Sequence, residues 1–139
     1  MRASRVVVGA VVGCLALAAA PSASAADDLM SGTFNLQGPN TVLDTWTITQ
    51  LCNYIELGCQ AKISSPLIEG QATYRGSHTW KMTLTGQVPV CADKSKTKGA
   101  MVFVWNTETL QGQLTEIQQG ACQLTRPGQT IIPFTLVAA

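Results

Sequence analysis

Apolar and hydroxyl side chains alternate along one stretch after another of this 139-residue chain. In residues 44–49 the alternation places Trp46 and Ile48 on one face of a strand and threonines on the other. The same alternation recurs in residues 79–85 and 130–137. Strands that bury one face and expose the other are typical of antiparallel sheets.

Further stretches bring the expected number of strands to about eight. Residues 32–36, 59–65, 71–75 and 110–115 alternate more weakly, and residues 101–105 are apolar on both faces, which predicts a central or doubly covered strand. Short turn-forming segments separate the runs and favour pairing between neighbouring strands. The sequence therefore predicts an all-β fold, an antiparallel meander that forms either a small barrel or a two-layer sandwich.

The N-terminus has the organisation of an export signal. Two arginines precede the apolar residues 6–20, and an Ala-Ser-Ala cleavage sequence ends at Ala25. Fifteen apolar residues span roughly 22 Å as a helix, less than the roughly 30 Å of a bilayer core, so no transmembrane helix is expected in the mature chain. We predict a secretory signal peptide over residues 1–25 and a single β-domain over residues 26–139.

An alternative processing site lies inside the apolar stretch. The residues that end at Cys14 loosely match a lipobox, in which the cysteine carries lipid. A lipid-bearing cysteine normally opens a polar tether, but here the apolar run continues to Ala20. We therefore favour a secreted or envelope protein cleaved near Ala25 over a lipoprotein.

The cysteines outside the signal predict two disulfides. Cleavage leaves Cys52, Cys59, Cys91 and Cys122, an even number, as expected in an oxidising compartment. Four cysteines allow three pairings. Cys52 ends one predicted strand and Cys59 begins the next, so the two residues lie opposite each other where the strands of a hairpin join their loop. The expected spacing suits a disulfide. That pairing leaves Cys91 with Cys122.

The cysteines also occur in a recognisable order with aromatic and turn residues. This order comprises Thr45–Ile48, Cys52, Cys59, Ile63–Ser65, Tyr74, His78–Trp80, Val90–Cys91, Trp105, Thr109–Gly112, Ala121–Cys122 and Pro133–Leu136. It resembles a group of small exported actinobacterial proteins with a signal peptide and two disulfides, best represented in mycobacteria. The resemblance implies a secreted or cell-envelope location and supplies no catalytic residue.

Charge and motif content exclude several classes of function. Removal of residues 1–25 lowers the net charge from +1 to −1, so no basic face for nucleic acid is expected. Ser77 and His78 are adjacent beside a turn, and adjacent strand residues point to opposite faces, so they do not form a catalytic pair. The Cys52–Cys59 spacing fits no zinc motif. We expect no enzyme activity, no metal and no cofactor.

Three groups of residues are candidates for binding. Trp46, Trp80 and Trp105 either pack the core or line a cavity for a hydrophobic ligand. Tyr54, Ile55 and Leu57 form a disulfide-clamped tip that is either exposed to a partner or folded back on the barrel. The lysine-rich residues 93–99 form a solvated turn or attract an anionic lipid or cell-wall polymer.

These observations predict a non-enzymatic exported β-domain. It acts by binding a protein or an envelope component, and the alternative is a carrier of a small hydrophobic ligand inside a barrel. The sequence does not specify an oligomeric state.

Overall fold

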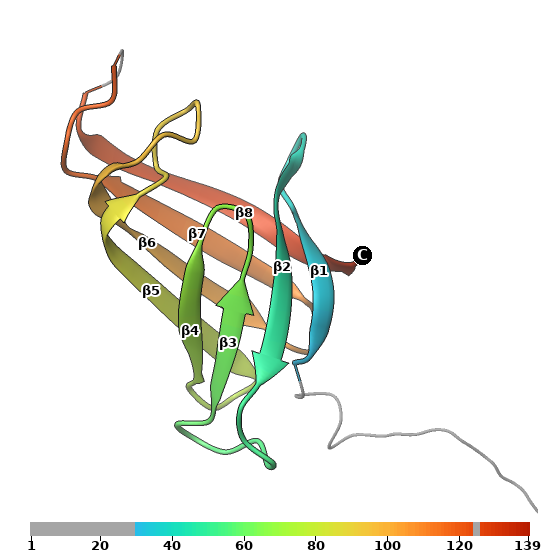
Figure 1. The fold of residues 1–139 in the computed structure, drawn as a ribbon. Coiled ribbons are helices and arrows are strands. Elements are labelled where there is room, and N and C mark those ends of the chain that lie inside the picture. Colours follow the sequence, from blue (N-terminus) through green and yellow to red (C-terminus); the bar gives the residue numbers. More distant parts are fainter. Residues whose placement is uncertain (1–29, 124–125) are drawn as a thin grey trace, which may run out of the picture.

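Eight antiparallel strands follow one another around a closed barrel in the computed structural model (Figure 1), which describes residues 30–123 and 126–139. They are β1 (Gly32–Gln37), β2 (Val42–Gln50), β3 (Gln60–Ser64), β4 (Glu69–Tyr74), β5 (Thr79–Val88), β6 (Thr97–Asn106), β7 (Gln111–Gln118) and β8 (Gly128–Ala138). Each strand pairs with the next, and β8 pairs with β1. The predicted all-β meander is confirmed, and it forms a barrel. The predicted signal peptide and Cys14 lie outside the described residues.

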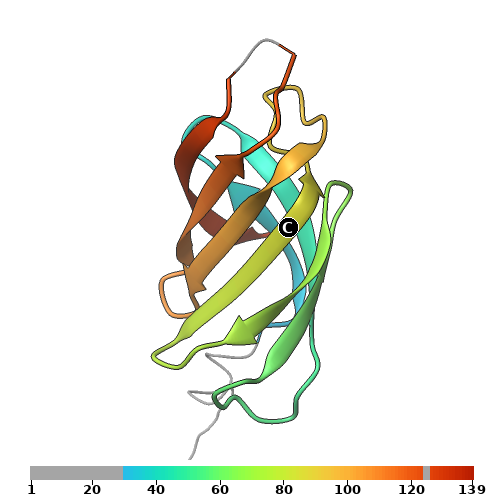
Figure 2. The same ribbon diagram turned by 90° about the vertical axis from the view of Figure 1, so that its left-hand side faces the viewer.

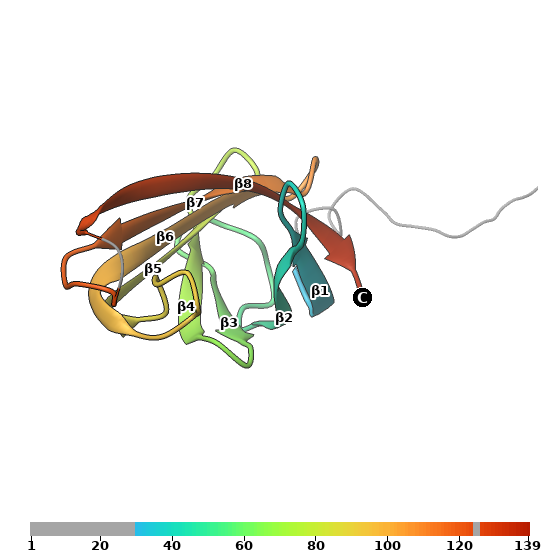
Figure 3. The same ribbon diagram turned by 90° about the horizontal axis from the view of Figure 1, so that it is seen from above.

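The barrel has two ends with different connections. One end, which we call the mouth, carries the β1–β2, β3–β4, β5–β6 and β7–β8 connections, and the opposite end carries the other three. Figure 3, which looks onto the mouth, shows the long strands β5–β8 as one curved wall with β1–β4 facing them. Figures 1 and 2 show the β5–β6 and β7–β8 connections side by side at the mouth.

The strands follow the alternation in the sequence. In β2, Trp46 and Ile48 are buried, while Thr47 between them is exposed. The register sets Trp46 beside Phe34 of β1 and sets Trp105 of β6 beside a second tryptophan on β5. Large inward side chains from separate strands therefore meet in the barrel interior, where they form the core.

Residues 101–105 were predicted to form a central or doubly covered strand, and of these alternatives double covering is wrong, since β6 has a paired strand on each side but no second layer among the described residues. These residues belong to β6, whose inward side chains are buried, but outward-facing Val104 is 36% exposed and Val102 is half-buried. No described element packs over this outer face. In a closed barrel only the inward face of a strand is covered by the core. The apolar side chains on the other face of β6 therefore lie on the outer surface of the barrel.

Both predicted disulfides are confirmed. Cys52 is bonded to Cys59, and Cys91 to Cys122, with Cα atoms 5.7 Å and 5.6 Å apart. Two disulfides are typical of proteins from oxidising compartments.

In the described part of the chain, no helix combines the length and the apolar character that crossing a membrane requires.

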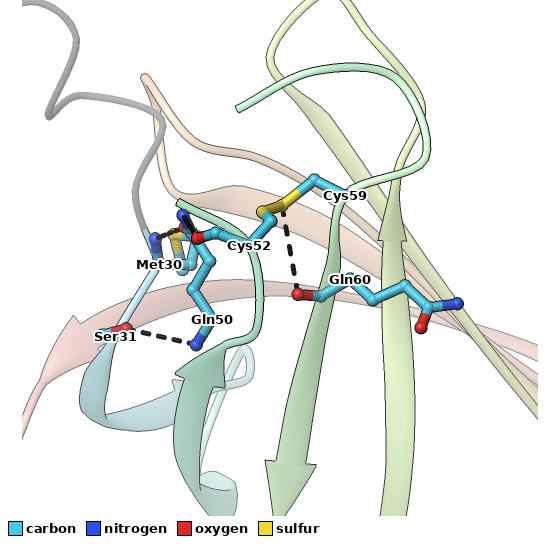
Figure 4. Close-up of a disulfide and its surroundings, with 6 residues drawn as sticks. All are labelled: Met30, Ser31, Gln50, Cys52, Cys59 and Gln60. Carbon is cyan, nitrogen blue, oxygen red and sulfur yellow. Dashed lines mark hydrogen bonds between the residues drawn. A yellow bond between two sulfur atoms is a disulfide. The ribbon is translucent and has the colours of Figure 1, made fainter. Parts of the chain in front are cut away.

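The Cys52–Cys59 disulfide lies at the end opposite the mouth, where the described chain enters the barrel (Figure 4). Gln50 joins the neighbouring segments. Its side-chain oxygen accepts a hydrogen bond from the backbone of Met30 (3.0 Å), and its side-chain amide donates to the carbonyl of Cys52 (3.0 Å). Its own backbone N–H donates to Ser31 Oγ (3.2 Å). This end is thus fastened by both a covalent bond and hydrogen bonds.

Pairing around the barrel is uneven. β4 and β5 pair only through residues 72–74 and 80–82, and β5 runs obliquely to β4 (Figure 1). Towards the mouth the two strands part, and the side chain of Leu84 lies over Gly70 in the space between them. We call this region the β4–β5 seam.

Gly112 provides the room that two aromatic side chains need. This residue of β7 lies between Trp105 of β6 and Phe134 of β8. A Cβ atom at Gly112 would lie 2.6 Å from Phe134 Cζ, 2.8 Å from Trp105 Cβ and 2.5 Å from the carbonyl oxygen of Val104. The absence of a side chain here lets the two rings fill the same level of the barrel.

We predict that Gly112→Ala destabilises the protein by about 1–3 kcal/mol, because backbone and ring atoms must move to admit the methyl group. Urea unfolding measures the effect. The matched control is Gly128→Ala, where the nearest atom to an added Cβ is the Arg126 carbonyl oxygen at 4.0 Å, and a change within about 0.5 kcal/mol is expected. Equal stability of the two variants would contradict the packing described.

Candidate functional site

A cavity of about 200 Å³ lies inside the mouth of the barrel. Side chains of the five strands β1, β2, β6, β7 and β8 and of the connections above them form it. The apolar part of its wall includes Leu36, Ile68, Met101, Phe103, Leu114 and Ile132. A concave, mostly apolar wall with a few polar groups is typical of small-molecule binding sites.

The cavity lies at the mouth because the inward side chains there are mostly aliphatic. Leu36 of β1, Met101 of β6 and Leu114 of β7 point inward in the mouth half of the barrel, and they fill less space than the rings deeper in the barrel. Phe103 is the boundary, since it lines the cavity and its ring centroid is 5.0 Å from that of Trp46. The interior is therefore hollow on one side of Phe103 and packed with rings on the other.

The prediction that the three tryptophans line a ligand cavity is wrong for this cavity. Trp46, Trp80 and Trp105 are at most 1% exposed, and none contributes to its wall. Trp46 packs edge-on against Trp105, with ring centroids 5.3 Å apart, and Trp80 packs edge-on against Tyr74 at 5.4 Å. The three rings belong to the core, which is the other role that the sequence allows for them.

The β5–β6 connection covers part of the cavity. Pro89, Val90 and Ala92 line it from above, together with Lys94. The ammonium group of Lys94 donates a hydrogen bond to the backbone carbonyl of Leu43 at the start of β2 (3.1 Å). The Lys-rich loop expected to be a solvated turn thus includes one lysine that reaches across the mouth.

The same connection is fixed at two further points. Cys91 is bonded to Cys122, which follows β7, so two neighbouring connections are joined covalently. Within the loop, Asp93 Oδ1 accepts hydrogen bonds from the backbone and hydroxyl of Ser95, and these bonds lower the pKa of the Asp93 carboxyl. The segment above the cavity is therefore attached to the barrel by a disulfide and a hydrogen bond and has a bonded turn of its own.

Asp44 and Ser65 fasten the β3–β4 connection to β2. Asp44 lines the cavity, and its Oδ2 accepts a hydrogen bond from Ser65 Oγ (2.6 Å). Ser65 Oγ in turn accepts hydrogen bonds from the backbone N–H groups of Leu67 (3.1 Å) and Ile68 (2.9 Å). One serine thus organises the turn beside the cavity and satisfies one carboxylate oxygen.

Glu116 is the polar group of the cavity wall that the protein leaves least satisfied. It lies on the inward face of β7, two residues beyond buried Leu114, and pairs with Met101 and Thr130 of the adjacent strands. Within residues 30–123 and 126–139, its carboxylate makes no hydrogen bond or ion pair. Burial raises the pKa of Glu116, and the charge of Lys94 opposes that rise.

Sequence reasoning missed Asp44, Lys94 and Glu116 as members of one site. A signal for Glu116 was present, because the alternation that marks Leu114 as inward continues by two residues to Glu116. Nothing local to Asp44 or Lys94 indicates that β2 and the β5–β6 connection meet at the same mouth.

The tip predicted to bind a partner lies at the opposite end of the barrel. Tyr54 is 80% exposed and Leu57 is 75% exposed. Ile55 differs from the prediction, because it is half-buried and packs against the core. The loop is held by hydrogen bonds from Gly58 N to the Tyr74 carbonyl (3.0 Å) and from Cys59 N to the carbonyl of the residue three positions before it (2.9 Å).

Ser77 and His78 lie in the turn between β4 and β5, as expected from the sequence. Both have left-handed backbone conformations, with φ of 52° and 60°. The backbone N–H of His78 donates to Tyr74 Oη (2.9 Å), and His78 Nε2 lies 3.8 Å from Glu108 Oε2. The turn is thus fixed to the strand before it and approaches the β6–β7 connection.

Comparison of the chain with protein-family models, with curated proteins and with solved structures gives no match.

The raised pKa of Glu116 predicts a pH-dependent effect on stability. Because folding favours its protonated form, the stability that Glu116 contributes is present at low pH and is lost as the pH rises through the raised pKa. We expect Glu116→Gln to increase the free energy of unfolding at pH 7 by less than about 1 kcal/mol, since a half-exposed carboxylate is partly screened. The difference from the unmodified protein should vanish below about pH 4.

Urea unfolding between acidic and neutral pH measures this difference. Glu56→Gln is the matched control, because Glu56 is exposed at the other end of the barrel. A difference for Glu116→Gln that stays constant with pH, or one equal to that of Glu56→Gln, would show that burial of the carboxylate at the mouth has no energetic consequence.

Proposed function

We propose that the protein binds a small apolar ligand in the cavity at the mouth of the barrel, without catalysing a reaction. The observation that carries this proposal is the partly enclosed, largely apolar space of about 200 Å³. An apolar cavity of about 150 Å³ is enough to bind benzene in another protein. The space here thus fits a ring or a chain of about six to eight carbon atoms.

The surroundings of the cavity support ligand binding, because they are fixed before a ligand arrives. Ser65 holds one connection to Asp44, Lys94 holds another to β2, and the Cys91–Cys122 disulfide joins the second connection to a third. A wall that is already ordered loses little conformational entropy on binding. Affinity then depends mainly on the apolar area that the ligand buries.

The volume sets the scale of affinity. Transfer of a six-carbon chain from water into the cavity contributes about 5 kcal/mol at about 0.8 kcal/mol per methylene. That free energy corresponds to a dissociation constant of roughly 0.1–1 mM. Fragments of this size therefore serve as probes in solution.

Filling the cavity should abolish binding. We predict that the unmodified protein binds n-hexanol with a dissociation constant of roughly 0.1–1 mM. Ile132→Trp, which places a ring in the cavity, should weaken binding at least about tenfold. Ile131→Trp is the matched control, because Ile131 is the preceding residue of β8, is 53% exposed and points outward. It should bind hexanol like the unmodified protein.

Titration followed by amide chemical shifts in NMR measures all three affinities, and urea unfolding confirms that both variants are folded. Absence of hexanol binding to the unmodified protein would contradict the proposal. Equal binding by a folded Ile132→Trp variant would place the ligand elsewhere.

The exposed tip supports a second candidate function, the binding of a protein or envelope component. Tyr54 and Leu57 are large apolar residues that the fold itself does not bury, and the Cys52–Cys59 disulfide closes the loop that carries them. A rigid loop that presents an aromatic side chain is suited to an interface. This surface and the cavity lie at opposite ends of the barrel, so one molecule has room for both functions.

We predict that Tyr54→Ala combined with Leu57→Ala changes the free energy of unfolding by less than about 1 kcal/mol, because both side chains are exposed. Ile55→Ala, the control from the same loop, should cost more, since Ile55 packs against the core. Thermal unfolding measures both effects. In a pull-down from cell-envelope fractions, the double variant should lose any specific partner that the unmodified protein retains. Unfolding of the double variant would assign the tip to the core.

A further inference from the structure

We infer that the mouth cavity selects apolar ligands whose polar end is a cationic amine. This inference rests on the proposed function, because it concerns the chemistry of a ligand bound in the same space. It follows from which polar groups of the wall are already bonded and which remain available to a ligand.

Two of the three charged groups in the wall are engaged by the protein. Asp44 accepts a hydrogen bond from Ser65 Oγ at one carboxylate oxygen (2.6 Å) and from the backbone of Thr45 at the other (2.9 Å). The ammonium group of Lys94 donates to the carbonyl of Leu43 (3.1 Å). These groups hold the connections in position.

Glu116 is different. Its carboxylate faces the cavity, is half-buried, and makes no hydrogen bond or ion pair within the part of the chain that the structure describes. A carboxylate removed from water accepts hydrogen bonds but donates none, so the complementary group on a ligand is a donor. A charged donor forms a shorter and stronger hydrogen bond with a carboxylate than a neutral donor does.

The net charge of the cavity wall also favours a cationic ligand. Asp44 and Glu116 each bring a negative charge to the wall, and Lys94 brings one positive charge. An anionic ligand would meet repulsion from two carboxylates and would have to compete for an ammonium group that already holds a backbone carbonyl. A cationic ligand meets the opposite field, so the site favours an amine over an acid of equal length.

The test uses three six-carbon probes that differ only in the polar end: hexylamine, n-hexanol and hexanoate. At pH 7 we expect the unmodified protein to bind hexylamine about tenfold more tightly than hexanol, and hexanoate more weakly than hexanol. Glu116→Gln should reduce the preference for the amine over the alcohol to about one, while it changes the affinity for hexanol less than about twofold. Glu56→Gln, at the opposite end of the barrel, should leave the preference unchanged.

A conservative variant adds a second readout. Glu116→Asp keeps the charge and shortens the side chain, so it should retain a measurable preference for hexylamine, which a purely structural role of Glu116 does not predict. If hexanol binds and hexylamine shows no preference, or if hexanoate binds most tightly, the inference of an amine ligand fails while the cavity remains a binding site. If none of the three probes binds, the proposed function itself fails.

Discussion

The edge-on packing of Trp46 against Phe103 and Trp105 determines where the interior of this barrel is solid. An eight-stranded barrel encloses a space that side chains just fill or that holds one small ligand. In this barrel, one half of the interior is filled by side chains and the other half contains a cavity. The aromatic rings occupy the half away from the mouth, and Phe103, which Trp46 contacts at 5.0 Å, forms the boundary with the cavity. The contact fixes the depth of the site as well as the stability of the core.

Much of the fold was predictable because its determinants are local. Alternation identifies an inward face within a single strand, as it does for Trp46 and Ile48, and the Cys52–Cys59 pairing depends on one hairpin. The choice between barrel and sandwich was not predictable in this way, because alternation records which residues face inward but not what they face. For the same reason, the apolar run in β6 left open whether this strand is central or covered on both faces.

The position of the cavity was not predictable because it depends on register between strands. Gly112 of β7 matters only because pairing sets it between Trp105 and Phe134, and that pairing follows from the closure of the whole barrel. Asp44 and Glu116 lie far apart in the sequence and on strands that are not neighbours. A search for two carboxylates within one strand could not bring them together. The exposure of Tyr54 and Leu57 in the β2–β3 loop agreed with the sequence-based prediction. The half-burial of Ile55 did not, because a residue of this loop packs against the core.

At the β4–β5 seam, side chains take the place of paired backbone in the barrel wall. Here the strands pair only near their common turn, and side chains such as Leu84 lie in the remaining space between them. Leu67, Ile68 and Pro89 stand at this weak line, since they border both the cavity and the shallow groove on its outer side. Side chains rearrange faster than paired backbone does. For the ligand proposed above, displacement of the side chains along the seam is therefore a route to the cavity that leaves the Cys91–Cys122 disulfide and the connections it joins in place.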